Sequence, residues 1–383
     1  MCLAPAHLRA QDNPAGIPIG YLRLVEQELT LSLIDLPPED AGIAGARLAI
    51  DDNNTTGRFT GQRFLLELAD VADSEQAVEA AREMADGGIG FIVADLPAEA
   101  LVAVADAVGE DATVLNVGAT DDRLRGADCR ANLVHVAPSR AMLADALAQY
   151  LVWKQWPRWF LIVGSHPADE SFAEAIRRAA QRFGGQIVEE RVYEDTGGAR
   201  RTDSGHVQVQ RQMPVFTQGA PDHDVVVVAD ESEVFGAYVP YRTWEPRPVA
   251  GTAGLTPTAW SPAHEQWGAI QLQNRFAEKA GRPMRADDLN AWTAVRMVGE
   301  AATRANSADA AEIAEYMLGE RFEIAAFKGE KLTLRDWDRQ LRQPILLSDR
   351  HTVVSVSPQE GFLHPSSYLD TLGYDRPESE CSL

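Results

Sequence analysis

The segment from Gly88 to Asp122 constrains the fold of this 383-residue chain more than any other. It contains two short apolar runs, GIGFIVADLP and TVLNVGATDD, on either side of an alanine-rich run, AEALVAVADAVGEDA. Short apolar runs of this kind are typical of buried parallel strands. The alanine-rich run places Leu101, Val104 and Val108 on one face of a helix. The segment therefore predicts strand, helix and strand, with ligands expected at the carboxyl ends of the strands.

The same alternation of apolar runs and helical segments recurs on both sides of this unit. Strands are predicted at residues 17–25, 59–72, 133–137, 159–163, 186–193, 224–229 and 248–254. Helices are predicted at residues 38–53, 74–86, 139–156, 170–183 and 205–216. The first helix takes its bounds from Pro38 in its first turn and from Asn53 and Gly57 at its end. Because the series starts afresh after residue 138, we predict an α/β fold with two similar lobes, each a parallel sheet flanked by helices.

Beyond residue 260, helices replace the alternation. Amphipathic helices are predicted at 262–280, 286–305 and 308–319, and short extended runs at 322–357. We assign residues 16–138 and 259–330 to an N-terminal lobe, 139–258 and 331–357 to a C-terminal lobe, and 358–383 to an irregular C-terminal tail. Residues 1–15 are expected to be a leader remnant or a disordered segment outside the fold. The chain then crosses between the lobes near residues 138, 258 and 330, and these three crossings are the expected hinge.

The net charge argues against two classes of partner. The chain has 35 basic and 57 acidic residues, so its formal net charge is −22. Nucleic acids and anionic membranes both favour clusters of Lys and Arg. The sequence also lacks a continuous apolar run of about 18 residues, the length that indicates a membrane-spanning helix. We therefore expect a chain that binds no nucleic acid and spans no membrane.

Three cysteines, Cys2, Cys129 and Cys381, are too few and too scattered for a zinc site. If the protein is exported, Cys129 and Cys381 are candidates for a disulfide bond. Closing so long a loop contributes about 4–5 kcal/mol in the chain-entropy model. The alternative is two unpaired thiols, and the sequence leaves both open.

Several segments, in their order along the chain, resemble a known family. These are 38–54 (PEDAGIAGARLAIDDNN), 77–92 (AVEAAREMADGGIGFI), 116–120 (NVGAT) and 292–295 (WTAV). Over roughly residues 17–357 the chain resembles the type I periplasmic solute-binding proteins of the branched-chain amino acid transporter class. Residues 138–147 (PSRAMLADAL) and 264–268 (HEQWG) resemble a subgroup that occurs with pyrroloquinoline-quinone-dependent (PQQ-dependent) alcohol oxidation.

The resemblance implies a function as well as a fold. It implies a monomeric periplasmic protein of an ABC transporter, which closes on a small ligand by hinge motion and delivers it to the permease. Such a protein is not an enzyme and needs no cofactor. The alternative is an accessory or ligand-sensing protein of the alcohol-oxidation system that uses the same fold.

Two departures from the family bear on the ligand. Amino-acid-binding members have a hydroxyl after the third strand for the ligand carboxylate, where this chain has Asp95-Leu96-Pro97. They have a carboxylate after the last sheet strand of the second lobe for the α-ammonium, where this chain has Gly251-Thr252-Ala253. The resemblance therefore implies a ligand other than a free α-amino acid.

The candidate ligand-binding residues lie at the predicted strand ends of both lobes. They are Asp95, Ala119, Thr120, Asp121, Asp169, Glu170, Asp230, Glu231 and Thr252. Carboxylates that face one cleft would favour a cation, a metal ion or a polyol. The alternative is that some of them cap helix N-termini, which suits Asp121, Asp169 and Glu231 equally well. We assign no catalytic residue and no metal ligand, because the sequence places no general base beside a nucleophile at these strand ends.

Overall fold

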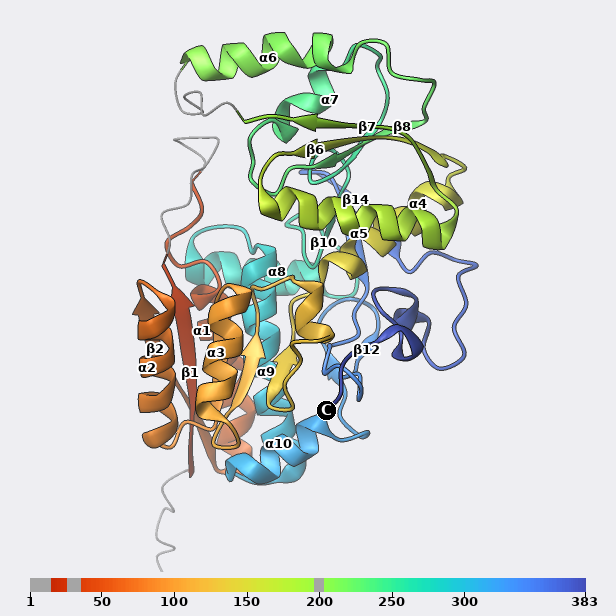
Figure 1. Ribbon diagram of the computed structural model, residues 1–383. Coiled ribbons are helices and arrows are strands. Elements are labelled where there is room, and N and C mark those ends of the chain that lie inside the picture. The colour runs from red at the N-terminus through yellow and green to blue at the C-terminus, as the bar shows by residue number, and fades with distance from the viewer. Residues whose placement is uncertain (1–14, 26–35, 196–202) are drawn as a thin grey trace, which may run out of the picture.

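The computed structural model describes residues 15–25, 36–195 and 203–383, which form two α/β lobes (Figure 1). The leader remnant is expected at residues 1–15, of which residues 1–14 lie outside the described part of the chain. Its bound is one residue too long, because Ala15 begins the first strand. The N-terminal lobe is built on a five-stranded sheet in the order β2-β1-β3-β4-β5. Its strands, all paired in parallel, are β1 (Ala15–Leu24), β2 (Gln62–Val71), β3 (Phe91–Asp95), β4 (Thr113–Asn116) and β5 (Leu133–His135).

The C-terminal lobe is built on a second parallel sheet, in the order β7-β6-β8-β9. Its strands are β6 (Arg158–Gly164), β7 (Gln186–Tyr193), β8 (Val225–Ala229) and β9 (Val249–Gly251). The central strands β6 and β8 are continuous runs of buried apolar residues, as expected when both faces of a parallel sheet are covered. The two parallel sheets predicted from the sequence are confirmed.

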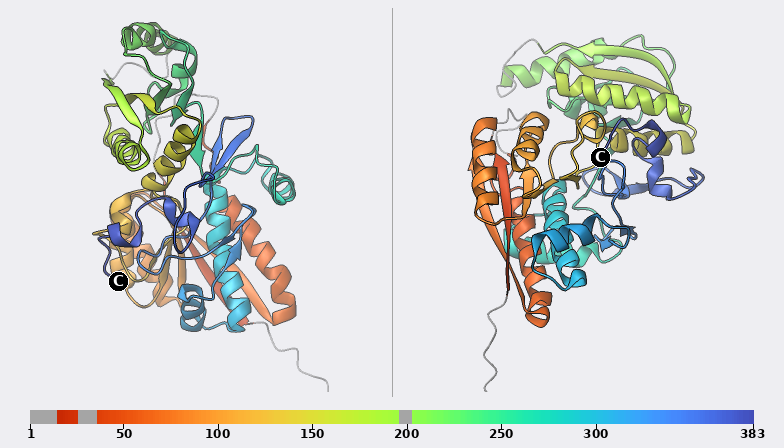
Figure 2. Two further views of the ribbon diagram at one scale, coloured as in Figure 1. Left: turned by 90° about the vertical axis from the view of Figure 1, so that its right-hand side faces the viewer. Right: turned by 60° about the horizontal axis from the view of Figure 1, so that its bottom comes forward.

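Helices cover both faces of each sheet (Figure 2). In the N-terminal lobe, α1 (Ile43–Thr60), α8 (Ala269–Ala280), α9 (Ala286–Ala305) and α10 (Ala310–Leu318) share one apolar core with one face of the sheet. On the other face lie α2 (Ser74–Asp86) and α3 (Ala98–Val108). In the C-terminal lobe, α4 (Arg140–Trp153) and α5 (Pro167–Phe183) pack on one face. The opposite face packs against residues of α6 (Asp203–Thr217) and α7 (Val239–Arg242).

A small antiparallel sheet lies at the junction of the lobes. It pairs β10 (Thr256–Thr258), β13 (Ile345–Ser348) and β14 (Val353–Ser357). Successive side chains of a strand point to opposite faces, and in β13 Leu346 joins the core of the N-terminal lobe while Leu347 joins that of the C-terminal lobe. A short hairpin of β11 (Ile324–Ala325) and β12 (Lys331–Leu332) precedes it, and the tail contains two 3-10 turns, η3 (Tyr368–Thr371) and η4 (Arg376–Glu378).

The predicted bounds of α1 are wrong at both ends. The helix begins at Ile43, because the preceding Gly42 has φ +73° and donates its N–H to Asp288. It continues through Asn53, which the sequence placed at its end, to a left-handed Gly61. Asn53 is buried and donates to the carbonyl oxygen of Val295 on α9 at 2.9 Å. A helix-ending residue type is thus used here to join two packed helices.

The predicted start of α8 at residue 262 is also wrong. The helix begins at Ala269, after Gly268 in the left-handed region at φ +83°. Residues 262–268 instead pack against the segment after β11, where the His264 ring nitrogen Nε2 lies 3.0 Å from the carbonyl oxygen of Phe327.

Candidate functional site

The candidate residues lie at the carboxyl ends of strands in both sheets, as expected. Asp95 ends β3, and Ala119, Thr120 and Asp121 follow β4. In the C-terminal lobe, Asp169 and Glu170 lie in the first turn of α5 after β6, Asp230 and Glu231 follow β8, and Thr252 follows β9. Contacts between these loops decide which of the residues come together.

Arg140, the first residue of α4, joins loops of the two lobes. Its Nε and Nη2 atoms donate to the Glu231 carboxylate at 2.9 and 2.8 Å, and its Nη1 lies 3.2 Å from Asp121 Oδ2. Its backbone N–H also donates to the carbonyl oxygen of Thr120 at 2.9 Å. Burial raises the pKa of Glu231, and the neighbouring Arg140 opposes that rise. Two of the predicted carboxylates therefore meet across the lobes, with one guanidinium between them.

Asp230 and Asp169 hold loops in place. The Asp230 carboxylate accepts backbone N–H groups of Val234 and Phe235, each at 2.9 Å. Burial raises the pKa of Asp230, although the hydrogen bonds from these amides act to lower it. Asp169 accepts the N–H of Ser232 at 2.8 Å and that of His166, the residue before α5, at 3.1 Å. The capping alternative is therefore right for Asp169, whereas Glu231 pairs with an arginine.

Three other candidates have described contacts of their own. Thr252 Oγ1 accepts the N–H of Asp230 at 3.0 Å, so its hydroxyl supports the β8 loop. Glu170 pairs with Arg177 at 2.7 Å on the exposed surface of α5. Ala119 is buried, and its carbonyl oxygen accepts from Asn116 Nδ2 at 2.8 Å.

Asp95 lies against the loop that follows β4. A Cβ atom on Gly118 would meet Asp95 Oδ1 at 2.4 Å, so only glycine leaves room for this carboxylate. The chain thus places a carboxylate, and not a hydroxyl, at the end of β3.

A buried polar network fixes the loop after β4 to the first chain crossing. Arg125 donates to the carbonyl oxygens of Ala119 and Ala137 at 3.1 and 2.7 Å and to Gln340 Oε1 at 2.8 Å. Burial lowers the pKa of Arg125 to about 10. His135 Nε2 lies 3.1 Å from the carbonyl oxygen of Leu124, so Nε2 carries the ring proton. Burial lowers the pKa of His135, and the ring contributes hydrogen bonds without charge.

Sequence reasoning missed Arg140, although its position carries a signal. A cation at the first position of a helix lies at the positive end of the helix dipole, where it is unfavourable without a carboxylate nearby. Such an arginine therefore predicts carboxylate partners, and Asp121 and Glu231 supply them.

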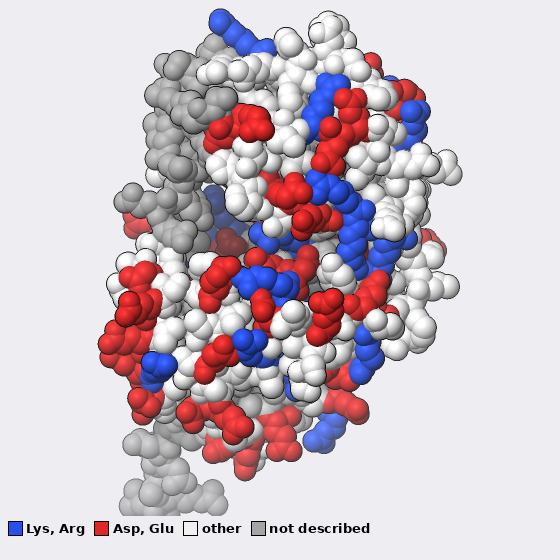
Figure 3. All heavy atoms as spheres, viewed as in Figure 1, with Lys and Arg blue, Asp and Glu red and all other residues white. Residues whose placement is uncertain are grey.

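The surface charge is uneven. Figure 3 shows acidic side chains over much of the N-terminal lobe and basic side chains near the level at which the lobes meet. Within residues 15–25, 36–195 and 203–383, no group of three or more His, Cys, Asp or Glu is arranged to hold a metal ion. No helix in the same residues is long and apolar enough to cross a membrane.

A cavity of about 500 Å³ lies beside the edge strand β7. Its walls include Val192 and Tyr193 of β7 and Val215 and Phe216 of α6. None of the nine candidate residues belongs to its described lining.

Comparisons with known proteins decide the fold. Residues 38–203 match the family model described as periplasmic binding protein. A periplasmic binding protein of Burkholderia mallei is 17% identical, with 96% of this chain and 99% of that chain covered and a TM-score of 0.67. An amino acid ABC transporter substrate-binding protein of Pseudomonas fluorescens is 14% identical, with the same coverage and a TM-score of 0.69. This chain has the periplasmic binding protein fold.

Two further proteins similar to this chain are named with the amino acids that they bind. An ABC transporter substrate-binding protein of Desulfitobacterium hafniense, in complex with Leu, is 16% identical over 88% of this chain and 99% of that chain, with a TM-score of 0.67. The Leu/Ile/Val-binding protein BraC3 of Rhizobium johnstonii is 33% identical over 106 residues. That match spans 25% of this chain and 28% of the relative. The matched family is one of binding proteins and not of enzymes.

Proposed function

We propose that this chain is a periplasmic solute-binding protein of an ABC transporter, which binds a small ligand between its lobes and delivers it to the permease. The observation that carries the proposal is the contact of Arg140 with Asp121 of one lobe and Glu231 of the other. In open α/β sheets ligands bind at the carboxyl ends of strands. Here two such ends meet. The likeness to ABC transporter substrate-binding proteins supports the same function.

Hinge closure belongs to the proposal. The expected lobes comprise residues 16–138 with 259–330 and residues 139–258 with 331–357. Leu332 and Leu341 pack in the core of the N-terminal lobe, so we place the third crossing after Leu341 and keep the other two near 138 and 258. A ligand that contacts both lobes favours the closed form by its differential affinity for the two forms. The protein acts as a monomer, since one chain supplies both lobes.

We further propose that the ligand is neutral or cationic, rich in hydroxyl groups, and not a free α-amino acid. A buried ammonium or carboxylate needs a partner of matching chemistry. The Glu231 carboxylate is already paired with Arg140, and the Thr252 hydroxyl already bonds Asp230. Asp95 would repel a ligand carboxylate. The likeness of residues 138–147 and 264–268 to the PQQ-associated subgroup supports a ligand from alcohol oxidation.

The ligand class predicts weak binding of leucine, isoleucine and valine. Leaving one buried charge unpaired costs roughly 3–5 kcal/mol, more than a hundredfold in affinity. Isothermal titration calorimetry should therefore give dissociation constants no tighter than about millimolar. Micromolar binding of leucine would overturn the proposed ligand class and leave the transport function standing.

A thermal-shift screen of alcohols, polyols, short acids and metal ions selects as its best hit the ligand that stabilises the protein most. Calorimetry with that ligand on substituted proteins then locates the binding site. Asp121→Asn should weaken that ligand at least tenfold. Glu170→Gln is the matched control, because Glu170 pairs with Arg177 on the surface of α5. Asp230→Ala should weaken it too, but Asp230 also holds the backbone of the β8 loop, so Asp121 provides the cleaner test. A ligand indifferent to Asp121→Asn places the site elsewhere.

Saturating ligand should compact the particle. Hinge closure brings the lobes together, so the radius of gyration from small-angle X-ray scattering should fall when the best hit is added. A scattering curve unchanged by a ligand of proven affinity contradicts closure. Closure without stimulation of ATP hydrolysis by the reconstituted transporter would favour the accessory or sensing role.

A further inference from the structure

The C-terminal tail, residues 358–383, passes from the C-terminal lobe to the N-terminal lobe. It follows β14 at the junction of the lobes and ends beside the N-terminal lobe, where the C-terminus lies in Figures 1 and 2. Three sets of contacts hold it, one in each lobe and one at the third chain crossing.

The first set fixes the tail to the core of the C-terminal lobe. Asp145 on α4 is fully buried, and its Oδ2 accepts the N–H of Gly373 at 2.8 Å. Arg178 and Arg182 of α5 pair with the same carboxylate, each at 3.0 Å. Leu372 is fully buried in the core that α4 and α5 share with the sheet. This part of the tail must therefore move with the C-terminal lobe.

The second set joins the tail to the segment of the third crossing. Asp370 is buried and accepts from Arg335 Nε at 2.9 Å and from Arg342 Nε at 2.8 Å. The segment that carries these arginines packs on the N-terminal lobe, since Leu332 and Leu341 belong to the core of that lobe.

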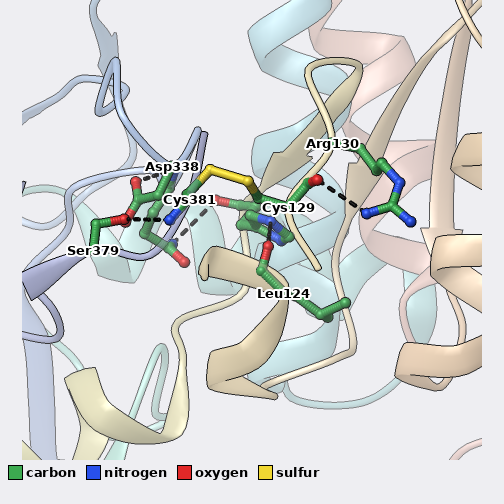
Figure 4. Close-up of a disulfide and its surroundings, with 8 residues drawn as sticks. Leu124, Cys129, Arg130, Asp338, Ser379 and Cys381 are labelled. Carbon is green, nitrogen blue, oxygen red and sulfur yellow. Dashed lines mark hydrogen bonds between the residues drawn. A yellow bond between two sulfur atoms is a disulfide. The ribbon is translucent and has the colours of Figure 1, made fainter. Parts of the chain in front are cut away.

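The third set is covalent. Cys381 is disulfide-bonded to Cys129, with the two Cα atoms 5.6 Å apart. Cys129 lies between the turn η1 (Asp122–Arg125) and β5, and Figure 4 shows the bond close to Leu124 and Asp338. The loop of Cys129 is fixed to the N-terminal lobe, because Arg130 pairs with Asp106 of α3.

We propose that the tail is a redox-sensitive strap that limits how far the two lobes open. It adds a covalent fourth connection to the three chain crossings. Residue 373 moves with α4 and Cys129 moves with the β5 loop, so opening of the lobes must extend residues 374–380 and separate Asp370 from Arg335 and Arg342. These ion pairs can break and form again, whereas the disulfide sets a fixed limit. This stretch is shortened by the η4 turn, whose Arg376 pairs with Asp336. The strap lies beside the first and third crossings, so it permits bending and restricts its amplitude. The inference rests on the hinge motion of the proposed function.

The chemical step is an ordinary thiol–disulfide exchange. A dithiol such as dithiothreitol transfers two electrons and two protons to the bond between Cys129 and Cys381. The products are two cysteine thiols and the cyclic disulfide of the reagent. Both cysteines are partly exposed, so the reagent has access. The contacts of Asp145 and Asp370 do not depend on the bond, so the remainder of the tail stays in place.

Single-molecule Förster resonance energy transfer between dyes on the two lobes tests the strap, because it measures the distance between the lobes without ligand. Dyes are attached through unnatural amino acids at Glu79 of α2 and Glu174 of α5, both exposed. The oxidised protein should give a narrow distribution of transfer efficiency. Dithiothreitol, or Cys381→Ser, should at least double its width and add a population of longer distance. Cys2→Ser is the control and should match the oxidised wild type.

If Cys381→Ser fails to fold, the comparison of oxidised with reduced wild-type protein is sufficient to test the strap. Equal distributions before and after reduction, with both thiols verified by mass spectrometry, overturn the strap. Because the measurement uses no ligand, that result leaves the transport function untouched. Failure of the ligand assays, conversely, leaves the distance result standing.

Discussion

Between about pH 7 and pH 10, the free energy of unfolding of the wild-type protein should rise by about 3–4 kcal/mol relative to that of a Lys328→Met variant. Lys328 is 1% exposed, in the segment that approaches the third chain crossing. Its ammonium group donates to Gln343 Oε1 and, at 3.2 Å, to the carbonyl oxygen of Pro344. Both described partners are neutral, and burial lowers the pKa of Lys328 from 10.5 to about 7.

The direction of the effect follows from the proton balance. Between pH 7 and 10.5 the unfolded chain keeps the proton of Lys328, whereas the folded protein releases it. Stability therefore rises with pH in that window, because the unfolded state binds more protons. Below about pH 7 both states hold the proton, and the full cost of burying the charge applies. Methionine has no charge, so the variant does not carry this cost at any pH. It leaves the two acceptors unpaired, which costs about 1–3 kcal/mol each at every pH.

Urea unfolding of both proteins at several pH values measures the difference. Lys154→Met is the matched control, since Lys154 is exposed at the end of α4, and its stability should run parallel to the wild type. Parallel curves for Lys328→Met and the wild type would show that Lys328 stays charged in the folded protein. Because Gln343 Nε2 donates to the carbonyl oxygen of Val136 at 2.7 Å, a charged Lys328 would place a buried cation beside the first crossing.

The repeating units of the fold were predictable from sequence because their signals are local. Buried strands such as β6 and β8 are continuous apolar runs, and α2 is capped by Asp73 just before it, which accepts the N–H of Gln76 at 2.9 Å. The bounds of α1 depend instead on tertiary contacts. Asn53 remains helical because Val295, far along the chain, accepts its side-chain N–H. No local pattern contains that information.

The same distinction applies to the candidate site. The sequence placed Asp121 and Glu231 at strand ends, which depends only on the order of strands and loops. It could not show that Arg140 would lie between them, because this contact requires the relative position of two lobes. Nor could it separate Asp230, whose carboxylate faces backbone amides of its own loop, from Glu231 beside it.

Loss of the disulfide should produce the other large effect. Cys129→Ser should lower the free energy of unfolding by about 5 kcal/mol at neutral pH, because the bond joins residues 252 apart in sequence and so restricts the unfolded chain. Reduction of the wild type should give the same loss. The measurement is urea unfolding of the oxidised, reduced and substituted proteins, with Cys2→Ser as the control expected to match the oxidised wild type.

The secondary structure of each lobe should change little, because Asp145 and Asp370 hold the preceding part of the tail without the bond. Circular dichroism of folded Cys129→Ser should therefore match that of the wild type, while its urea midpoint falls. A midpoint equal to that of the oxidised wild type would contradict the entropic argument. It would mean that the unfolded chain already keeps residues near Cys129 and Cys381 together, since only then does closing so long a loop cost the unfolded state no entropy.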